Sequence, residues 1–319
     1  MITRTVFVIA AMLAGATTHA QNYPARAVRL VVPYVPGGGT DFTARVIAPK
    51  LSEALGQQVV VENRPGGGTN IGSDLVAKAA PDGYTLLMAG AANAINMSLY
   101  AKLPYDTLRD FAPVSLSVKG ANVLLVHPSL PVKNLKELLA LARAQPGKLN
   151  YASSGIGSAN HMAGELLKLV AKVNIAHVPY KGNAPALTDL IGGHVEILIS
   201  GVPAVIGQIK NGRVRAIAIA SLKRFPALPD TPTIDESGLK GFEATTWFGV
   251  VAPAKTSRDI VTRLNAELAR IVAAPDVRER FIGEGVEPIG GSTELFTNFI
   301  RDEIDKYAKV VKAAAIAAE

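Results

Sequence analysis

The chain contains no cysteine in its 319 residues. This absence excludes disulfide bonds, catalysis by a thiol and metal sites built on thiolate ligands. The five histidines are dispersed without an H-E-x-x-H pattern, and the sequence has neither a G-x-G-x-x-G fingerprint nor a phosphate-binding loop with its lysine. We therefore expect no bound metal and no cofactor.

Runs of basic residues are also missing. Lys and Arg outnumber Asp and Glu by 33 to 26, which gives a formal net charge of +7, but the cations are scattered among the acids. A nucleic-acid-binding surface needs a clustered patch of Lys and Arg, so we expect no nucleic-acid partner. A modest positive field of this kind assists the capture of small anions.

The N-terminus has the pattern of a cleavable signal peptide. Arg4 precedes an apolar stretch over Val6–Ala16, and the small residues Thr18 and Ala20 stand two residues apart just after it. The stretch is shorter than the roughly 20 residues that a membrane-spanning helix needs. Because no cysteine is available for a lipid anchor, we expect residues 1–20 to be removed after Ala20 and the mature protein to be periplasmic.

Short runs rich in Val, Ile and Leu alternate with helical patterns along the rest of the chain. Examples are VRLVVPY, QQVVVEN, YTLLMAG, NVLLVHP, VEILIS and VRAIAIAS. These runs are apolar at consecutive positions, as in strands that helices cover on both faces. The order predicts an α/β protein with parallel, doubly wound sheets, and the chain is long enough for two domains.

Two glycine-rich junctions join an apolar run to a helical pattern. They are VRLVVPYVPGGGTDFTARVI over Val28–Ile47 and KLNYASSGIGSANHMAGELL over Lys148–Leu167. At such a junction the unpaired N–H groups and the positive end of the helix point into one turn, which favours an anion. Two junctions on one chain predict a clamp around a small anion.

In the first junction, glycine allows the backbone to approach a ligand closely. Thr40 or Asp41 stands where a helix N-cap belongs, and a carboxylate ligand would be repelled by Asp41, so we expect Asp41 to cap the helix. Tyr34 is a candidate for the pocket wall. The predicted contacts of this junction are Tyr34, Gly37, Gly38, Gly39, Thr40 and Asp41.

The second junction offers hydroxyl and N–H donors ahead of a helix that should begin near Asn160. His161, in the first turn of that helix, is either a donor to the ligand or a partner of a neighbouring loop, and we expect it to be neutral there. The predicted contacts of this junction are Ser153, Ser154, Gly157, Ser158 and His161.

Further candidates stand at the ends of other apolar runs, where open α/β sheets place ligands. Ala92 and Asn93 follow YTLLMAG, and Lys181 follows the run that ends at Tyr180. Trp247 and Phe248 either stack on an aromatic ligand or pack in the core, and the core is the better expectation for the tryptophan.

The motifs that carry these features stand in an order that resembles the Bug family, the substrate-binding proteins of tripartite tricarboxylate transporters. They are PGGGTD, VVVENRPGGGTNIG, AAPDGYTLL, YASSGIGSANHMAGE, VPYKGNAPALTDLIGGHVE and TWFGVVAP. The resemblance covers essentially the whole mature chain. It implies a type II periplasmic-binding-protein fold, in which two doubly wound α/β domains are joined by two crossing strands with the ligand cleft between them.

The resemblance also implies the domain division. Residues 21–123 and 246–319 would form a discontinuous first domain, and residues 124–245 the second. Family members bind carboxylates or related small molecules, so a small carboxylate is the expected ligand. Ser200 stands where many relatives have an acidic residue that could hold an ammonium group, which favours an acid without an amino group.

The expected protein partners are the membrane permease subunits of a tripartite transporter or, alternatively, a sensor kinase that reads the liganded shape. We expect a monomer. A secreted hydrolase using Ser153 or Ser154 with His161 is a third interpretation, but Tyr151 replaces the first glycine of a G-x-S-x-G elbow. We therefore expect no catalytic residues.

Overall fold

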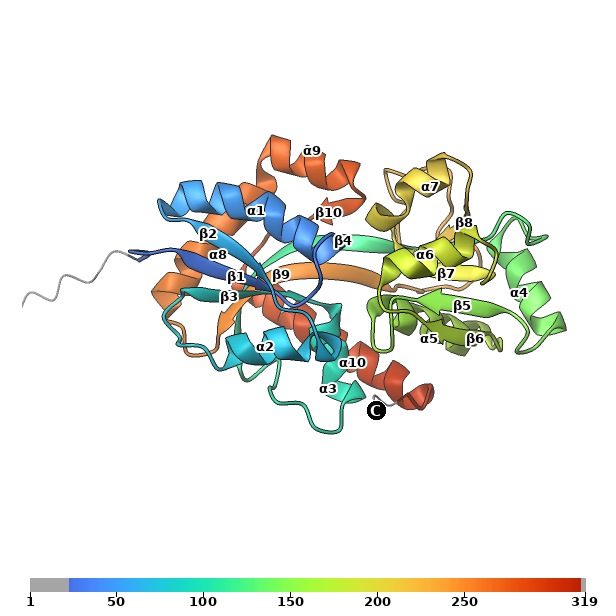
Figure 1. Cartoon of the computed structure of the whole chain (residues 1–319), viewed down its shortest axis with the longest axis horizontal. Coiled ribbons are helices and arrows are strands. Elements are labelled where there is room, and N and C mark those ends of the chain that lie inside the picture. The colour runs from blue at the N-terminus through green and yellow to red at the C-terminus, as the bar shows by residue number, and fades with distance from the viewer. Residues whose placement is uncertain (1–22, 317–319) are drawn as a thin grey trace, which may run out of the picture.

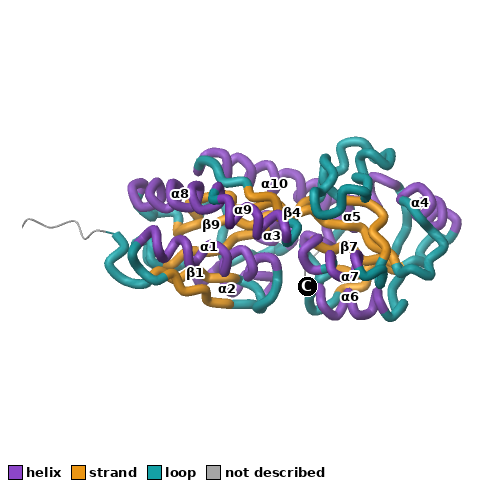
Figure 2. The backbone as a smooth tube through the Cα atoms, turned by 90° about the horizontal axis from the view of Figure 1, so that it is seen from above, coloured by secondary structure: helices purple, strands orange, loops and turns teal. Residues whose placement is uncertain are grey.

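The computed structural model describes residues 23–316, so the expected signal peptide lies outside the described residues. The chain forms two halves side by side, each a sheet with helices on both faces (Figure 1). Two long strands, β4 (Phe111–Val126) and β9 (Thr245–Pro253), run from one half to the other. Figure 2 shows the same two halves from above, with strands at the centre of each.

The strands of the described chain are β1 (Val28–Val32), β2 (Val59–Asn63), β3 (Thr85–Gly90), β4 (Phe111–Val126), β5 (Asn150–Ser153), β6 (Ala176–Pro179), β7 (Ile197–Gly201), β8 (Arg215–Ile219), β9 (Thr245–Pro253) and β10 (Val286–Pro288).

The α-helices are α1 (Gly39–Leu55), α2 (Asn70–Ala77), α3 (Ala91–Leu99), α4 (Leu135–Ala144), α5 (Ala159–Ala171), α6 (Asn183–Ile191), α7 (Ile206–Lys210), α8 (Arg258–Ala273), α9 (Pro275–Gly283) and α10 (Thr293–Ala313). Two 3₁₀ turns, η1 (Gly67–Thr69) and η2 (Val202–Ala204), complete the described elements. Within residues 23–316, no helix has both the length and the apolar character needed to span a bilayer.

The predicted parallel pairing holds for only part of the sheet. β1 pairs in parallel with β2 and β3, and β5 pairs in parallel with β6 and β7. The prediction is wrong for β4 and β9, which are antiparallel to each other and to their other partners. The reason is topological: β4 leaves the first half and β9 returns to it, so the two strands run in opposite directions.

The partners of β4 change part-way along its length. Up to Ala121 it pairs with β9, and from Asn122 it pairs with β7 and β8. At this point the buried amide of Asn122 donates to the backbone oxygen of Ala244 at 2.8 Å, which ties the two connecting segments together. The expected domain division at residues 123 and 245 stays a prediction, and this change of partners lies close to it.

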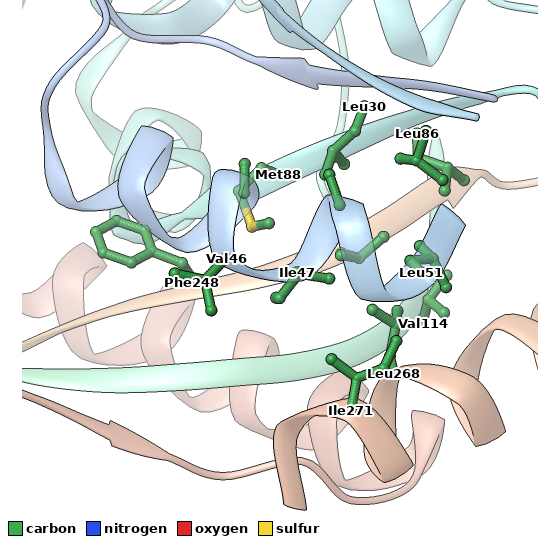
Figure 3. Packing of buried hydrophobic residues seen from close by; sticks show 14 of the residues in the cluster. Leu30, Val46, Ile47, Leu51, Leu86, Met88, Val114, Phe248, Leu268 and Ile271 are labelled. Carbon is green, nitrogen blue, oxygen red and sulfur yellow. The ribbon is translucent and has the colours of Figure 1, made fainter. Parts of the chain in front are cut away.

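Each half has an apolar core on both faces of its sheet. Along β1, Leu30 points into a cluster with α1 and α8, whereas Val31 points into a cluster with α3 and α10. Figure 3 shows the first of these clusters, with Leu30 and Met88 above Ile47 of α1. Consecutive apolar residues in a strand are therefore explained by burial on both faces.

Trp247 of β9 is a core residue, as expected from its sequence context. Its side chain is fully buried, and the indole Nε1 donates to Oε2 of Glu303 in α10 at 2.9 Å. Phe296 and Phe299 pack edge-on against the ring. The tryptophan thus anchors a connecting strand to the C-terminal helix.

Replacing Trp247 with phenylalanine should lower the free energy of unfolding by about 1 to 2 kcal/mol, because the carboxylate of Glu303 loses a buried donor and the core loses volume. Urea unfolding followed by far-ultraviolet circular dichroism measures the change. An unaltered midpoint would show that the indole bond to Glu303 contributes no net stability.

Candidate functional site

The first predicted turn connects β1 to α1. Gly37 has φ of 92°, in the left-handed region that favours glycine, and Gly38 is extended and serves as the N-cap of α1. The expectation that Thr40 or Asp41 caps the helix is wrong by two to three residues. Because Gly38 has no side chain to close the helix start, Asp41 reaches back from the third helical position and accepts from the Gly37 N–H at 3.0 Å.

Asp41 holds this turn through three donors. Besides Gly37, Nε of Arg45 donates to it at 2.9 Å and Nδ2 of Asn63 at 2.9 Å. Asn63 also donates to the backbone oxygen of Tyr34 at 3.0 Å, so β2 is tied to both ends of the turn. Burial alone would raise the pKa of this carboxyl, but the bonds from Arg45, Gly37 and Asn63 hold the pKa below its usual range. Asp41 therefore organises the turn, and a contact between Asp41 and a ligand stays a prediction.

The same turn has unpaired donors. Across residues 23–316, no acceptor is found for the backbone N–H groups of Gly38, Gly39 and Thr40, and the α1 dipole adds positive potential there. Gly37 and Gly38 are exposed. Tyr34 is half-buried against the core, and burial raises the pKa of its hydroxyl, so it stays neutral.

The starts of α1 and α3 converge on Phe248. A β-carbon added to Gly39 would lie 3.0 Å from Cε2 of this ring, and one added to Gly90, the N-cap of α3, would lie 3.2 Å from Cδ1. Figure 3 shows Phe248 beside the first turns of α1. Two positive helix ends thus lie over one aromatic ring, an arrangement that residue spacing does not predict.

The side chain of Asn93 makes two hydrogen bonds within the protein. Its Oδ1 accepts from the Gly90 N–H at 3.0 Å, and its Nδ2 donates to Oγ of Ser73 at 2.9 Å. Asn93 is 1% exposed, and Ala92 is buried as well. This amide therefore shapes the start of α3, and the ligand contact of Asn93 stays a prediction.

The second turn connects β5 to α5. Ser158 caps α5: its Oγ accepts from the His161 N–H at 3.2 Å and donates to the oxygen of Gly155 at 2.7 Å. Gly155 and Gly157 have φ of 127° and 76°, so the tight turn requires glycine. The hydroxyl of Ser154, which is half-buried, has no hydrogen-bond partner within residues 23–316.

Two histidines lie stacked behind this turn. The rings of His161 and His177 are 4.0 Å apart between centroids and inclined by 17°. Nδ1 of His161 accepts from the Gly157 N–H at 3.2 Å, and Nε2 of His177 lies 2.7 Å from Oγ of Ser153. His161 is thus a structural partner of the turn and neutral, as one of the two sequence interpretations held. The sequence analysis did not single out His177, whose only sequence feature is its place before VPYKG.

Ser153, the hydrogen-bond partner of His177, is buried in the protein. Ser153 has no exposed surface, and its Oγ also lies 3.1 Å from the Gly155 N–H, which donates to it. Its partner is His177, whereas the hydrolase interpretation required His161. A substrate carbonyl cannot reach this hydroxyl, so the arrangement gives no support to hydrolysis.

The second turn also contacts the first half. A β-carbon added to Gly157 would lie 2.3 Å from Cδ2 of Leu99 and 3.8 Å from Oδ1 of Asn96, both on α3. Helix α3 has nine residues and is therefore about 13 Å long. Its N-terminus lies beside the first turn through Phe248, and its C-terminal end touches the second turn.

Two other predicted contacts, Ser200 and Lys181, belong to segments that lie next to the second turn. The Gly182 N–H donates to the oxygen of Ser154, and the amide of Asn160 in α5 donates to the oxygen of Ile199. Ser200 is fully buried, and its Oγ donates to Oδ1 of Asn183 at 2.9 Å, so it fastens β7 to α6. A ligand contact of Ser200 stays a prediction. Lys181 is exposed in the bend before α6.

A surface hollow of about 430 Å³ lies elsewhere, between α5 and α10. Its walls are Leu166, Leu169, Asp302, Asp305, Lys306, Lys309 and Val310. It contains no helix start and mixes acids with lysines, so it lacks the donor pattern of the two turns.

Comparison with known proteins identifies the family. Residues 43–316 match the model of TctC, described as the tripartite tricarboxylate transporter family receptor. The chain belongs to this family. The resemblance inferred from the glycine-rich motifs is confirmed.

Relatives of this TctC receptor cover nearly its whole length. It is 43% identical to "UPF0065 protein in tcbD-tcbE intergenic region" of Pseudomonas sp. (strain P51), over 95% of this chain and 91% of the relative. It is 40% identical to protein BugT of Bordetella pertussis, over 96% and 94% of the two chains.

Solved structures confirm the fold class. R. palustris Rpa4515, described with adipate, superposes with a TM-score of 0.86 at 40% identity, over 92% of this chain and 99% of that one. MatC (Rpa3494) from Rhodopseudomonas palustris, with bound malate, gives 0.83 at 34% identity, over 91% and 100%. The periplasmic binding protein BugD gives 0.84 at 37% identity, over 93% and 100%.

Proposed function

We propose that this TctC-family receptor captures a small carboxylate in the periplasm between its two glycine-rich turns. It then presents the ligand to the membrane subunits of a tripartite transporter. The observation that carries the proposal is a pair of helix starts joined through Phe248 and α3. Among the described residues, the backbone N–H groups of Gly38–Thr40 at the start of α1 have no acceptor, and the Ser154 hydroxyl ahead of the Ser158 cap of α5 has no partner. Backbone N–H groups at helix starts favour an anion without requiring a charged side chain.

Two relatives support the ligand class. The structures described with adipate and with malate share this fold over nine-tenths of the chain, and both molecules are dicarboxylates. Each N–H to carboxylate bond contributes modestly, and several donors with bridging water together give useful affinity. Closure of the two halves around the acid would exclude bulk water and give the permease a shape to recognise.

A thermal-shift screen of the mature protein tests the proposal. The panel holds malate, adipate, citrate, benzoate and the free amino acids, and any hit is followed by titration calorimetry. Selective stabilisation by one or more unaminated acids is expected, because a ligand that binds only the folded state raises its stability with concentration. If no acid shifts the transition, carboxylate capture is wrong.

Ser154→Ala should weaken binding of the best acid about tenfold, which corresponds to about 1.4 kcal/mol. The reason is that its half-buried hydroxyl is a donor with no partner among the described residues. Ser129→Ala is the matched control, since Ser129 is exposed and bonds only to His127. Equal affinities for the Ser154 variant and the wild type in calorimetry would remove Ser154 from the site.

A further inference from the structure

The histidine stack is attached to both ends of the second turn. At one end, His177 contacts Oγ of Ser153, and this oxygen accepts from the Gly155 N–H. At the other end, Nδ1 of His161 accepts from the Gly157 N–H. The shape of the turn therefore depends on two imidazoles that lie face to face.

Through Gly157, the turn connects these imidazoles to the other half of the molecule. Gly157 is the residue whose N–H bonds to His161, and it is also the residue packed against Leu99 and Asn96 of α3. A β-carbon at this position would overlap Leu99, so the contact is close. The loss of the His161 bond would therefore act directly on Gly157, the residue that forms the contact between the two halves.

The groups around the stack do little to stabilise a positive charge on either imidazole. Tyr151 of β5 stacks on His177, and its hydroxyl donates to Glu165 of α5 at 2.6 Å. Lys168 donates to the same carboxylate at 2.8 Å, and Nε2 of His161 is 3.9 Å from it. Glu165 is therefore already neutralised by a lysine, which limits what it offers a protonated imidazole.

Burial is the main effect on both imidazoles. It lowers the pKa of His161 to about 4, and the nearby Lys168 acts in the same direction. Burial also lowers the pKa of His177 to about 4, with the charges of His161 and Lys168 adding to the effect and that of Glu165 opposing it. Both rings are neutral at neutral pH. For His161, the bond that Nδ1 accepts from the Gly157 N–H requires this neutral form.

We propose that His161 and His177 are positioning residues that hold the Ser153–Ser158 turn in its binding shape, and that protonation of this pair detaches the turn from α3 and releases the ligand. The inference rests on the proposed function for the ligand, but the coupling of the histidines to the turn does not.

The chemistry of release follows from the tautomer. A proton on Nδ1 of His161 occupies the lone pair that accepts from Gly157, so two N–H donors then face each other. A second proton on His177 places two cations 4.0 Å apart between centroids, beside the positive end of α5. An unfolded histidine takes up its proton near pH 6.5 and the folded pair near 4, so the folded shape loses stability as the pH falls from about 6.5 to about 4.

Amide hydrogen exchange at Gly157, measured by NMR on the full mature protein without ligand, tests the coupling. In the wild type, the protection of this amide should fall at least tenfold between pH 6.5 and pH 4, after correction for the intrinsic exchange rate. His161→Leu should lose the protection at every pH, whereas His161→Asn should keep it, because Oδ1 of asparagine replaces Nδ1 as the acceptor. Unchanged protection in His161→Leu would overturn the proposal.

A variant that keeps the hydrogen bonds but has no ionisable ring distinguishes a positioning role of the histidines from a packing role. The double variant His161→Asn, His177→Gln keeps both hydrogen-bonding positions without an ionisable ring, so its Gly157 protection should be independent of pH. His194→Gln, at an exposed histidine after α6, is the control and should respond to pH as the wild type does. If the double variant loses protection on acidification like the wild type, the histidines are not the switch.

Calorimetry with malate and adipate, each compared between the wild type and the double variant at the same pH, tests release. Protonation of the acid itself cancels in this comparison. The wild type should lose at least tenfold more affinity than the double variant between pH 6.5 and pH 4, and equal losses would overturn the release step. Absence of binding by either protein at pH 7.5 would count against carboxylate capture and against release, while the exchange data still decide the coupling.

Discussion

Gly38→Val is expected to weaken carboxylate binding at least a hundredfold, about 2.7 kcal/mol, and to leave the protein folded. Gly38 is extended, with φ of −86° and ψ of 172°, a conformation that valine adopts readily. A β-carbon added there meets nothing within 4 Å, so we expect the branched side chain to be accommodated. It would instead fill the open space beside the unpaired N–H groups of Gly38–Thr40, where the acid is proposed to bind.

Calorimetry with the best acid from the screen measures the affinity, and thermal unfolding without ligand measures stability. Gly207→Val is the matched control, because Gly207 in α7 also has open space around it and belongs to neither turn. The control should bind like the wild type. A Gly38 variant that binds with full affinity would show that the first turn does not hold the ligand.

Gly39 is a less useful position for this test. Its added β-carbon would press on Phe248, so a valine there would disturb the core and the site together. The two neighbouring glycines therefore differ in their surroundings. Gly38 faces open space, whereas a side chain at Gly39 would press on the Phe248 ring of β9.

The local features of this protein were predictable from its sequence. Strands such as Val28–Val32, the glycine turns that follow them and the α/β order all depend on residues close together in the chain. The neutral state of His161 was expected from its place at a helix start, although in the structure burial is the main cause of its lowered pKa. Antiparallel pairing of β4 and β9 was missed, because the direction of a strand that returns from another half is a property of the topology and leaves no mark on the strand itself.

The long-range contacts around the site were not predictable for a related reason. Phe248 meets Gly39 and Gly90 only after three distant segments have packed, and His177 meets His161 only because β6 lies beside β5. The sequence shows that Gly39 is glycine, but it does not show which ring requires it. Likewise, Asp41 stood close to a helix start, yet its partner Asn63 comes from β2.

Asp41→Ala is the second substitution with a large expected effect, a loss of about 2 to 3 kcal/mol in the free energy of unfolding. The side chain is 5% exposed and accepts from Gly37, Arg45 and Asn63, so its removal leaves the Gly37 N–H without an acceptor and the Asn63 amide with only the Tyr34 oxygen. Because the first turn is held by these bonds, carboxylate affinity should fall as well. Urea unfolding at pH 7 measures the stability and calorimetry measures the affinity.

The pH dependence of this loss identifies its cause. The folded pKa of Asp41 is below the ordinary value of 3.8, so the carboxylate stabilises the fold fully above about pH 3.8 and the contribution is lost as the pH falls through the folded pKa. The stability difference between wild type and Asp41→Ala should therefore be constant from pH 7 to pH 5 and shrink below pH 3.8. Asp276→Ala is the control, since Asp276 pairs with Lys50 at 2.8 Å but is 61% exposed, and such surface pairs contribute little. If the two variants lose equal stability, the charge of Asp41 is not what holds the turn.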